Sequence, residues 1–313
     1  MKISGLALPG LFYGSQGWIS YSCVEVKPRD LNIGGIPQYP SVMLHYFEEG
    51  KKLYADTTMA KLRLGSGDNP LYSEQRYGLR LNWGIPVSFN NTYLYGKYRI
   101  ENVILWDRGV STSDFGDYMV GSLGISLVYD SRDDKIHPTT GWYGELSGEQ
   151  GLKALGGSED FSKFALELKR FLSLGKTGIV GFHLLGEKGL NLPIYEKYVN
   201  NLSALRKCEV LRGYGRNRFM GDVALTGNLE YRSPTYWIEW FGIGGVVFLD
   251  VGRIWNSDGD SIKFPQDIRF GTGVGMRMFF AEKFVMHLDF GFSEESIKES
   301  PGFSFWIGAF HVF

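Results

Sequence analysis

The sequence lacks any long apolar run, which excludes one large class of membrane protein. A helix that crosses a bilayer needs about 18 or more consecutive apolar residues, and no stretch of the 313 residues approaches that length. Segments with helical spacing and N-caps are nearly absent as well. A membrane-spanning strand needs only ~9–11 residues, of which half must be apolar. A mean hydropathy of −0.14 is therefore compatible with a β-barrel in a membrane.

Charge imbalance, cysteine pairs and metal-binding spacings are also missing. The 33 basic and 34 acidic residues nearly cancel, whereas a nucleic-acid-binding protein shows a basic excess. Cys23 and Cys208 lie too far apart for a metal or redox motif, and one disulfide or two free thiols both remain open. No metal-binding spacing connects the five histidines, which are His45, His137, His183, His287 and His311. We therefore expect no nucleic-acid partner, no cofactor and no metal.

Enzyme signatures are equally scarce. The sequence contains no nucleophile elbow and no kinase-like or metalloprotease motif. The glycines of residues 271–275 resemble a dinucleotide-binding loop only superficially, because they fall within a predicted strand and no helix follows them. We predict that the chain is not an enzyme.

Short segments of alternating polarity are what the sequence has in abundance. Aromatic residues make up 15% of the chain, and there are 42 glycines, both above ordinary usage. The alternation predicts fourteen strands, at about residues 17–27, 40–49, 53–64, 75–86, 91–105, 117–130, 141–150, 160–172, 177–189, 222–233, 241–254, 265–279, 282–293 and 302–313.

The two faces of most predicted strands can be assigned directly. In residues 76–83, four large apolar side chains alternate with Arg76, Gly78, Arg80 and Asn82. A shift by one residue would place both arginines in lipid, at roughly 2–4 kcal/mol each near the midplane. The segments 122–130, 223–232 and 284–292 alternate in the same way, but residues 53–64 do not allow a face to be assigned.

Connections of alternating length separate these strands. Long ones are predicted near 28–39, 65–74, 106–116, 151–159, 190–221, 255–264 and 294–301, and tight turns at 49–52, 173–176 and 281–282, with 131–140 as an exception. Short periplasmic turns and long outer loops are typical of outer-membrane barrels. A large soluble barrel or sandwich with an apolar core is the alternative, and connection lengths and outward aromatic residues favour the membrane.

We therefore predict an all-β fold, a transmembrane antiparallel up-and-down β-barrel of about 14–16 strands. Residues 1–16 are predicted as an N-terminal periplasmic entry segment and residues 17–313 as the barrel domain. Met1 to Gly10 do not fit a signal peptide, because Gly5, Pro9 and Gly10 interrupt the apolar stretch. A barrel in the outer membrane must be exported, so we expect a leader that is not evident in this chain.

The longest connection, residues 190–221, carries the most specific motif, Leu211-Arg212-Gly213-Tyr214. A long loop with apolar and basic residues of its own is usually packed or functional. We expect this extracellular loop to fold inward. Arg212 then needs a carboxylate, because an unpaired buried charge is costly.

The strands that follow supply partners for this arginine. Asp250 in Phe248-Leu249-Asp250 faces inward, as does Glu230. Glycine within a strand often marks the close approach of another backbone, and three glycines share the inner face of one later strand. We hypothesise that the loop lies over these glycines, fixed by Arg212 to Asp250; the three are Gly271, Gly273 and Gly275.

These motifs resemble those of the BamA/TamA-type bacterial surface-antigen barrels. Leu211-Arg212-Gly213-Tyr214 is similar to the [V/I]RG[F/Y] signature of that family. In the family, the loop between the eleventh and twelfth strands folds inward, and its arginine contacts an acid of an F-x-D strand. Phe248 and Asp250 match that strand, and Gly271 and Gly273 match the G-x-G strand that follows it.

Further segments support the resemblance. The family's Y-D-S-R-D periplasmic hairpin is similar to Tyr129-Asp130-Ser131-Arg132-Asp133, followed by Pro138 and Gly141. Residues 228–232, with Glu230 at their centre, match the strand after the loop. Phe313 resembles the terminal aromatic residue that targets barrels for assembly, although His311 departs from the usual aromatic residue two positions earlier.

The resemblance implies a role in inserting or assembling outer-membrane proteins, or in protein translocation. The implied partners are outer-membrane lipid and unfolded outer-membrane proteins or a secreted or anchored protein. Family members with these roles carry periplasmic polypeptide-transport-associated domains, and we expect this chain to be a barrel-only member or a truncated product. A passive pore or a membrane anchor for a partner protein remains the alternative, with the bacterial outer membrane as the expected location.

Overall fold

The fold is given by a computed structural model. It describes residues 10–14, 17–27, 31–33, 35–51, 54–57, 60–63, 72–87, 90–107, 116–199, 211–214, 219–257, 268–281, 284–298 and 303–309.

Nearly all of the regular structure is β-strand. The strands are β1 (Gly10–Gly14), β2 (Gly17–Val26), β3 (Leu31–Ile33), β4 (Ile36–Lys51), β5 (Tyr54–Thr57), β6 (Ala60–Arg63), β7 (Tyr72–Pro86), β8 (Thr92–Asp107), β9 (Gly116–Asp130), β10 (Gly141–Gly151), β11 (Phe161–Ser173), β12 (Ile179–Leu190), β13 (Tyr198–Val199), β14 (Met220–Gly221), β15 (Val223–Arg232), β16 (Tyr236–Ile238), β17 (Phe241–Trp255), β18 (Arg269–Phe280), β19 (Phe284–Ser293) and β20 (Ser304–Ala309). The helical elements are η1 (Lys153–Leu155), η2 (Gly175–Thr177), η3 (Ile194–Glu196) and α1 (Glu294–Lys298). Among the described residues, no helix has both the length and the apolar character needed to cross a membrane.

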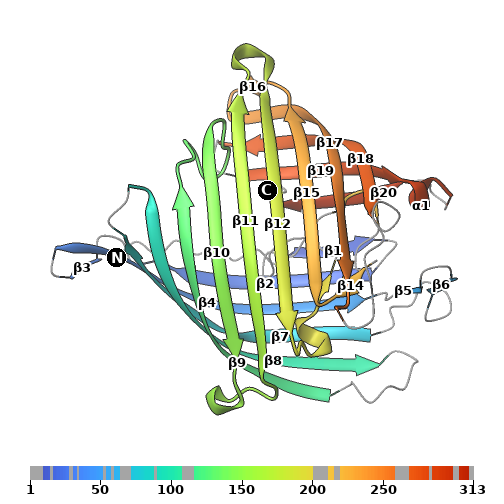
Figure 1. The fold of residues 1–313 in the computed structure, drawn as a ribbon. Coiled ribbons are helices and arrows are strands. Elements are labelled where there is room, and N and C mark those ends of the chain that lie inside the picture. Colours follow the sequence, from blue (N-terminus) through green and yellow to red (C-terminus); the bar gives the residue numbers. More distant parts are fainter. Residues whose placement is uncertain are drawn as a thin grey trace. The chain divides into compact units, whose positions relative to one another are not determined.

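Sixteen of the described strands form one large sheet in which neighbours along the chain are neighbours in space (Figure 1). Its order is β1-β2-β4-β7-β8-β9-β10-β11-β12-β15-β17-β18-β19-β20, with β3 paired to β4 and β16 paired to β17. β5 pairs with β6 and β13 with β14 in two separate two-stranded sheets. The registers, such as those of β4 with β7 and β17 with β18, are antiparallel. The prediction of an all-β, antiparallel, up-and-down membrane fold with about fourteen strands is confirmed.

The chain divides into two compact units. The first comprises residues 1–129, 145–165 and 188–197, and the second comprises residues 130–144, 166–187 and 198–313. Each unit is described by itself below.

In the second unit the two sheet faces differ as predicted, and strand β15 shows it most clearly. Leu225 is 47% exposed and Leu229 38%, whereas Glu230 is fully buried and Arg232 is 2% exposed. A soluble barrel would have the opposite arrangement, with apolar side chains inside. A face that is apolar where it is exposed and charged where it is buried is what a membrane-spanning sheet requires.

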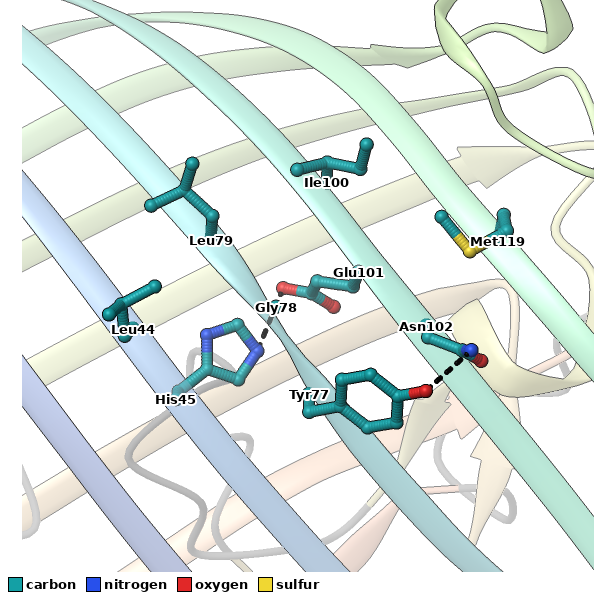
Figure 2. A pocket seen from close by; sticks show the side chains of 9 residues that line it. All are labelled: Leu44, His45, Tyr77, Gly78, Leu79, Ile100, Glu101, Asn102 and Met119. Atoms are coloured by element: carbon teal, nitrogen blue, oxygen red, sulfur yellow. Dashed lines mark hydrogen bonds and ion pairs between the residues drawn. The ribbon is translucent and has the colours of Figure 1, made fainter.

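The first unit repeats this inversion on strands β4, β7, β8 and β9. Figure 2 shows two polar contacts there. His45 reaches Glu101 across the backbone of β7 at Gly78, with 3.4 Å between Nε2 and Oε1. The amide of Asn102 donates to the hydroxyl of the neighbouring Tyr77 at 2.8 Å. Glu101 and His45 are buried, while Tyr77 is exposed, so the pattern of residues 76–83 holds in space.

Gly78 explains how the buried pair fits. A Cβ atom at this position would lie 2.3 Å from the carbonyl oxygen of Ile100 and 2.8 Å from Cγ of Glu101. Any side chain there would displace Glu101, so glycine is required for the contact between Glu101 and His45.

The structure corrects three of the sequence predictions near the N-terminus. Residues 53–64 do not form a strand of the large sheet but the separate hairpin β5–β6. The turn predicted at residues 49–52 lies largely within the long strand β4, whose pairing with β7 continues to Lys51. The predicted entry segment, residues 1–16, contains strand β1, which pairs with β2.

Three connections of one series in the strand order are tight. They lie at residues 87–91, 174–178 and 281–283 and carry residues with positive φ at Asn91, Gly175 and Ala281. The longest connections, residues 52–71, 191–222 and 256–268, all belong to the other series. The connection predicted near residues 28–39 spans residues 27–35 and includes the short strand β3, which pairs with β4.

The exposed apolar face predicts a position-specific cost of charge. We expect Ile125→Arg, at an exposed position in the middle of β9, to lower the free energy of unfolding by about 2–4 kcal/mol near the midplane. Ile125→Phe is the matched control and should change it little. The measurement is a urea titration of protein folded into phospholipid vesicles. Equal stabilities of the two variants would mean that this face does not meet lipid.

Candidate functional site

The Leu211–Tyr214 motif lies buried against the inner face of the second unit. Its backbone closes a turn in which the amide of Tyr214 donates to the carbonyl oxygen of Leu211 at 3.0 Å. Leu211 and Arg212 are fully buried, and Tyr214 is 5% exposed. The connection that carries the motif begins after β12 and ends at β15, with β13 and β14 paired to each other along the way.

Asp250 on β17 binds Arg212 through both carboxylate oxygens. The Nε and Nη2 atoms of Arg212 donate to Oδ2 and Oδ1 at 2.9 and 2.8 Å. The backbone amide of Arg212 also donates to Oδ2 at 2.9 Å. The guanidinium carbon lies 3.5 Å from the centre of the Phe248 ring. The predicted pairing of the loop arginine with the F-x-D strand is thus the geometry observed.

Two further carboxylates and two further guanidinium groups surround this pair. Nη1 of Arg212 lies 2.8 Å from Glu230 and 3.4 Å from Asp289. Arg277 lies 2.6 Å from Asp289 and 3.0 Å from Glu230, and Arg232 lies 2.7 Å from Glu230. We call these six side chains the Arg212 network; it consists of Arg212, Arg232, Arg277, Glu230, Asp250 and Asp289.

Charge balance is what allows the network to be buried. Its three carboxylates face three guanidinium groups, and no member is more than 2% exposed. Desolvating an unpaired ion costs several kcal/mol, so each charge depends on the others. Asn228 extends the set by donating to Asp250 at 2.8 Å and by contacting His183 at 2.9 Å.

Glycines let the loop backbone approach the sheet backbone. A Cβ atom on Gly271 would lie 2.8 Å from the amide nitrogen of Gly213, and one on Gly291 only 1.8 Å from the carbonyl oxygen of Arg212. A Cβ on Gly213 would lie 2.5 Å from the carbonyl oxygen of Phe292. Side chains at these positions would push the loop away from the sheet.

The predicted row of three glycines under the loop needs correction. Only Gly271 has the loop backbone as its near neighbour. Gly273 faces the ring of Phe248, and Gly275 faces the carboxylate of Asp289. The space over these two glycines is filled by side chains of adjacent strands rather than by the loop.

The loop also contacts β20. The indole nitrogen of Trp306 donates to the carbonyl oxygen of Arg212 at 3.0 Å, and the hydroxyl of Ser304 donates to the carbonyl oxygen of Gly213 at 3.4 Å. Trp306 is 2% exposed. The motif therefore joins β17, β18 and β19 to a strand that stands at one end of the sheet order.

Sequence analysis missed several of these partners. Arg277 follows Gly271, Gly273 and Gly275 on the same face, and Asp289 has the inward parity in residues 284–292, so alternation could have flagged both. Gly291 could have been found in the same way. Trp306 could not, because its contact with the loop depends on the register of β20.

The predicted periplasmic hairpin is a hydrogen-bonded turn in the second unit. Arg132 donates to both oxygens of Asp130, at 2.8 and 2.9 Å. Asp133 accepts from the backbone amides of Asp134, Thr139 and Thr140 at 2.9–3.1 Å and from the hydroxyl of Thr139. Burial alone would raise the pKa of Asp133, but these hydrogen bonds hold the pKa below its ordinary value. Pro138 is buried beside the turn.

Gly141 begins β10 in a conformation that other residues rarely adopt. Its φ is +108°, and a Cβ there would lie 2.3 Å from the carbonyl oxygen of Ser131. The hairpin is also held to β18, since the ring of His137 contacts the ring of Phe279 at 4.6 Å between centroids. The last predicted site residue, Phe313, lies outside the described residues.

The described part of the chain contains no group of three or more His, Cys, Asp or Glu side chains that could hold a metal ion. The arrangement at Arg212 is thus one of charge pairing and close backbone packing. It fixes an inward-folded loop to the buried side of an antiparallel membrane sheet. The chain therefore belongs to the class of transmembrane β-barrel proteins that hold a long loop against their inner face.

Comparison with known proteins identifies the family. The model of the Omp85 superfamily domain matches residues 41–310. The chain belongs to the Omp85 superfamily, and the resemblance predicted from the motifs is confirmed.

The relatives and solved structures that the chain resembles share little sequence identity with it. The outer membrane protein assembly factor BamA of Nitratidesulfovibrio vulgaris is 23% identical over 308 residues, covering 86% of this chain and 37% of that protein. The crystal structure of BamA from Haemophilus ducreyi lacking POTRA domains 1–3 superimposes with a TM-score of 0.60 at 13% identity, over 95% of this chain and 62% of that one. CdiB from Escherichia coli gives 0.60 at 12% identity, over 94% and 52%. The chain thus spans less than two thirds of the length of each.

The Arg212 network predicts strong coupling between Arg212 and Asp250. We expect Arg212→Ala or Asp250→Ala to lower the free energy of unfolding by about 3–5 kcal/mol each, because each leaves a buried charge unpaired. The double variant should lose clearly less than the sum. Urea titration in detergent micelles, with gel heat-modifiability as a second readout, measures this.

An ion pair on the protein surface provides the control for the double-mutant cycle of Arg212 and Asp250. Lys153 and Glu159 lie 3.3 Å apart with 58% and 51% of their side chains exposed, and exposed pairs contribute about 0–1 kcal/mol. The cycle of Lys153→Ala and Glu159→Ala should show small, additive effects. Additive losses at Arg212 and Asp250 of the same size would contradict their interdependence.

Gly141 gives a separate prediction for the hairpin between β9 and β10. Gly141→Ala combines a strained φ with a backbone clash, whereas Gly175→Ala has a φ of +67° and open space around the added methyl group. We expect the Gly175 variant to lose about 1–2 kcal/mol of stability and the Gly141 variant to lose more. Urea titration compares them, and a smaller loss at Gly141 would show that the turn relaxes freely.

Proposed function

We propose that this barrel takes part in the insertion of outer-membrane proteins or in the translocation of proteins across the outer membrane. Proteins of the Omp85 superfamily are transporters and assembly factors. The relative from N. vulgaris, BamA, is an outer membrane protein assembly factor. The bacterial outer membrane is the corresponding location, and client outer-membrane or secreted proteins are the corresponding partners.

The observation that carries the proposal is the contact between the Arg212 loop and β20. Two carbonyl oxygens of the loop accept hydrogen bonds from Trp306 and Ser304. Because the same loop is fixed to β17 by Asp250, the position of β20 is tied to the Arg212 network. A movement of the loop would break these two contacts of β20, while the pairing of β20 with β19 would remain.

A released strand can act on a client through backbone pairing. An unpaired strand edge presents a row of amides and carbonyl oxygens that another chain can join. β1 and β20 stand at the two ends of the strand order. We infer that β20 offers its edge to an incoming strand when the loop releases it, and that the loop controls when this happens.

The alternative is a passive pore or an anchor for a partner protein. A pore needs a polar interior, which the buried charged face supplies. Arg212, however, binds the loop to that face by five hydrogen bonds and ion pairs, and Trp306 and Ser304 add two hydrogen bonds. Such a device is more than a pore or an anchor needs.

Depletion in the native bacterium tests the proposed function. We expect loss of the protein to lower the levels of a set of outer-membrane or secreted proteins, measured by quantitative mass spectrometry of outer-membrane and secreted fractions. Wild-type protein and the Lys153→Ala variant should restore these levels, and Arg212→Ala should not restore them even where its folded amount matches wild type.

Two outcomes would contradict the proposal. Unchanged protein levels together with reduced solute uptake would indicate a pore. Unchanged levels together with release of one surface protein would indicate an anchor.

A further inference from the structure

A second buried ion cluster lies in the first unit, and the same connection that carries Arg212 supplies one of its members. Residues 191–199 lead from β12 through η3 to β13. Glu196, the last residue of η3, is 2% exposed, as is Tyr195. A carboxylate so deeply buried requires compensating charge.

Three cations on three strands meet the Glu196 carboxylate. Nη1 of Arg76 on β7 lies 2.8 Å from Oε1. Nη1 and Nη2 of Arg99 on β8 each lie 3.1 Å from the carboxylate, one at each oxygen. Nζ of Lys163 on β11 contacts Oε2. Both oxygens of Glu196 are therefore bound, and Arg99 binds them in the bidentate manner that favours arginine for carboxylate recognition.

Arg76 also holds the backbone of the connection. Its Nη2 atom donates to the carbonyl oxygen of Tyr195 at 2.6 Å. The ring of Tyr195 packs against that of Tyr118 with 4.7 Å between centroids. Side chain and main chain of this short segment are thus fixed together.

Two of the cations that bind Glu196 also bind acids of the neighbouring strands. Arg76 contacts Glu74 and Glu101 at 3.0 and 2.8 Å, and Arg99 contacts Glu149 and Glu101 at 2.5 and 3.2 Å. Arg80 also binds Glu101. Among the described residues, these contacts join four cations, which are Arg76, Arg80, Arg99 and Lys163, to Glu196 and to three acids of the neighbouring strands, which are Glu74, Glu101 and Glu149.

We propose that Arg76, Arg99 and Lys163 form a carboxylate-binding site on the buried face, and that the chain's own Glu196 is its ligand. The site fastens the start of the connection, independently of the Arg212 network that fastens its later part. The two attachments differ in the sign of their charge. At Glu196 the connection contributes an acidic side chain that binds basic residues, and at Arg212 it contributes a basic side chain that binds acidic residues. This inference does not depend on the proposed function.

Chemical rescue tests the site. Glu196→Ala leaves the three cations around an unfilled space that a small carboxylate fits. We expect the variant to unfold at a lower temperature than wild type in the heat-modifiability assay. Sodium acetate or formate should recover much of the loss with a saturable concentration dependence, while sodium chloride at the same ionic strength should not. The protein is the full chain in detergent micelles.

The control is Glu159→Ala, which removes an exposed acid paired with Lys153. It should leave the unfolding temperature nearly unchanged and show no difference between acetate and chloride. Equal behaviour of the Glu196 and Glu159 variants, or equal effects of acetate and chloride on the Glu196 variant, would overturn the proposed site.

A second pair of variants keeps the test decisive if Glu196→Ala does not fold. Glu196→Gln preserves shape and removes the charge. We expect Lys163→Met to lower the unfolding temperature in wild type, where it removes a ligand of the carboxylate, and to lower it much less in Glu196→Gln, where that carboxylate is absent. Equal decreases in both backgrounds would refute recognition of the carboxylate by these cations.

Discussion

The burial of one arginine determines which charged residues and glycines the neighbouring strands of the second unit must carry. Arg212 has no exposed surface, and a guanidinium in that position requires carboxylates at hydrogen-bond distance. Asp250, Glu230 and Asp289 meet this need, and Arg277 and Arg232 then compensate the remaining negative charge. Glycine at Gly213, Gly271 and Gly291 follows from the same constraint, because the loop backbone must approach closely for the arginine to reach its partners.

This buried polar face is the counterpart of the exposed apolar one. A sheet that presents Leu225 and Leu229 outward must turn the intervening residues inward, because side chains alternate along a strand. Those residues can be charged only if neighbouring strands supply opposite charges in register. The pairings Asn228 with Asp250 and Asp250 with Gly271 place these groups in one row across three strands. Lipid on one face thereby makes an ion network possible on the other.

Alternation along single strands was enough to predict the fold class, the faces of β7, β9, β15 and β19, and the inward direction of Asp250. It failed at residues 53–64, where charged residues of opposite parity hide the fact that the segment forms a small hairpin outside the large sheet. It also could not show which inward residues meet. The contact of Trp306 with the loop, and that of Glu196 with Arg76 and Arg99, depend on register and join residues that lie 94 to 120 positions apart in the sequence.

The opposite polarity of the two attachments has a physical consequence of its own. Glu196 placed among Asp250, Glu230 and Asp289 would be repelled, and Arg212 placed beside Arg76, Arg99 and Lys163 would be repelled as well. A wrong contact that buries an unpaired charge or brings like charges together costs more free energy than the correct ion pair contributes. The reason is that the cost of desolvating each charge is not recovered in the wrong contact. A connection with one acidic and one basic attachment residue therefore disfavours the arrangement in which the two residues exchange their binding sites. Two apolar attachments of similar size would not distinguish that direction from its reverse.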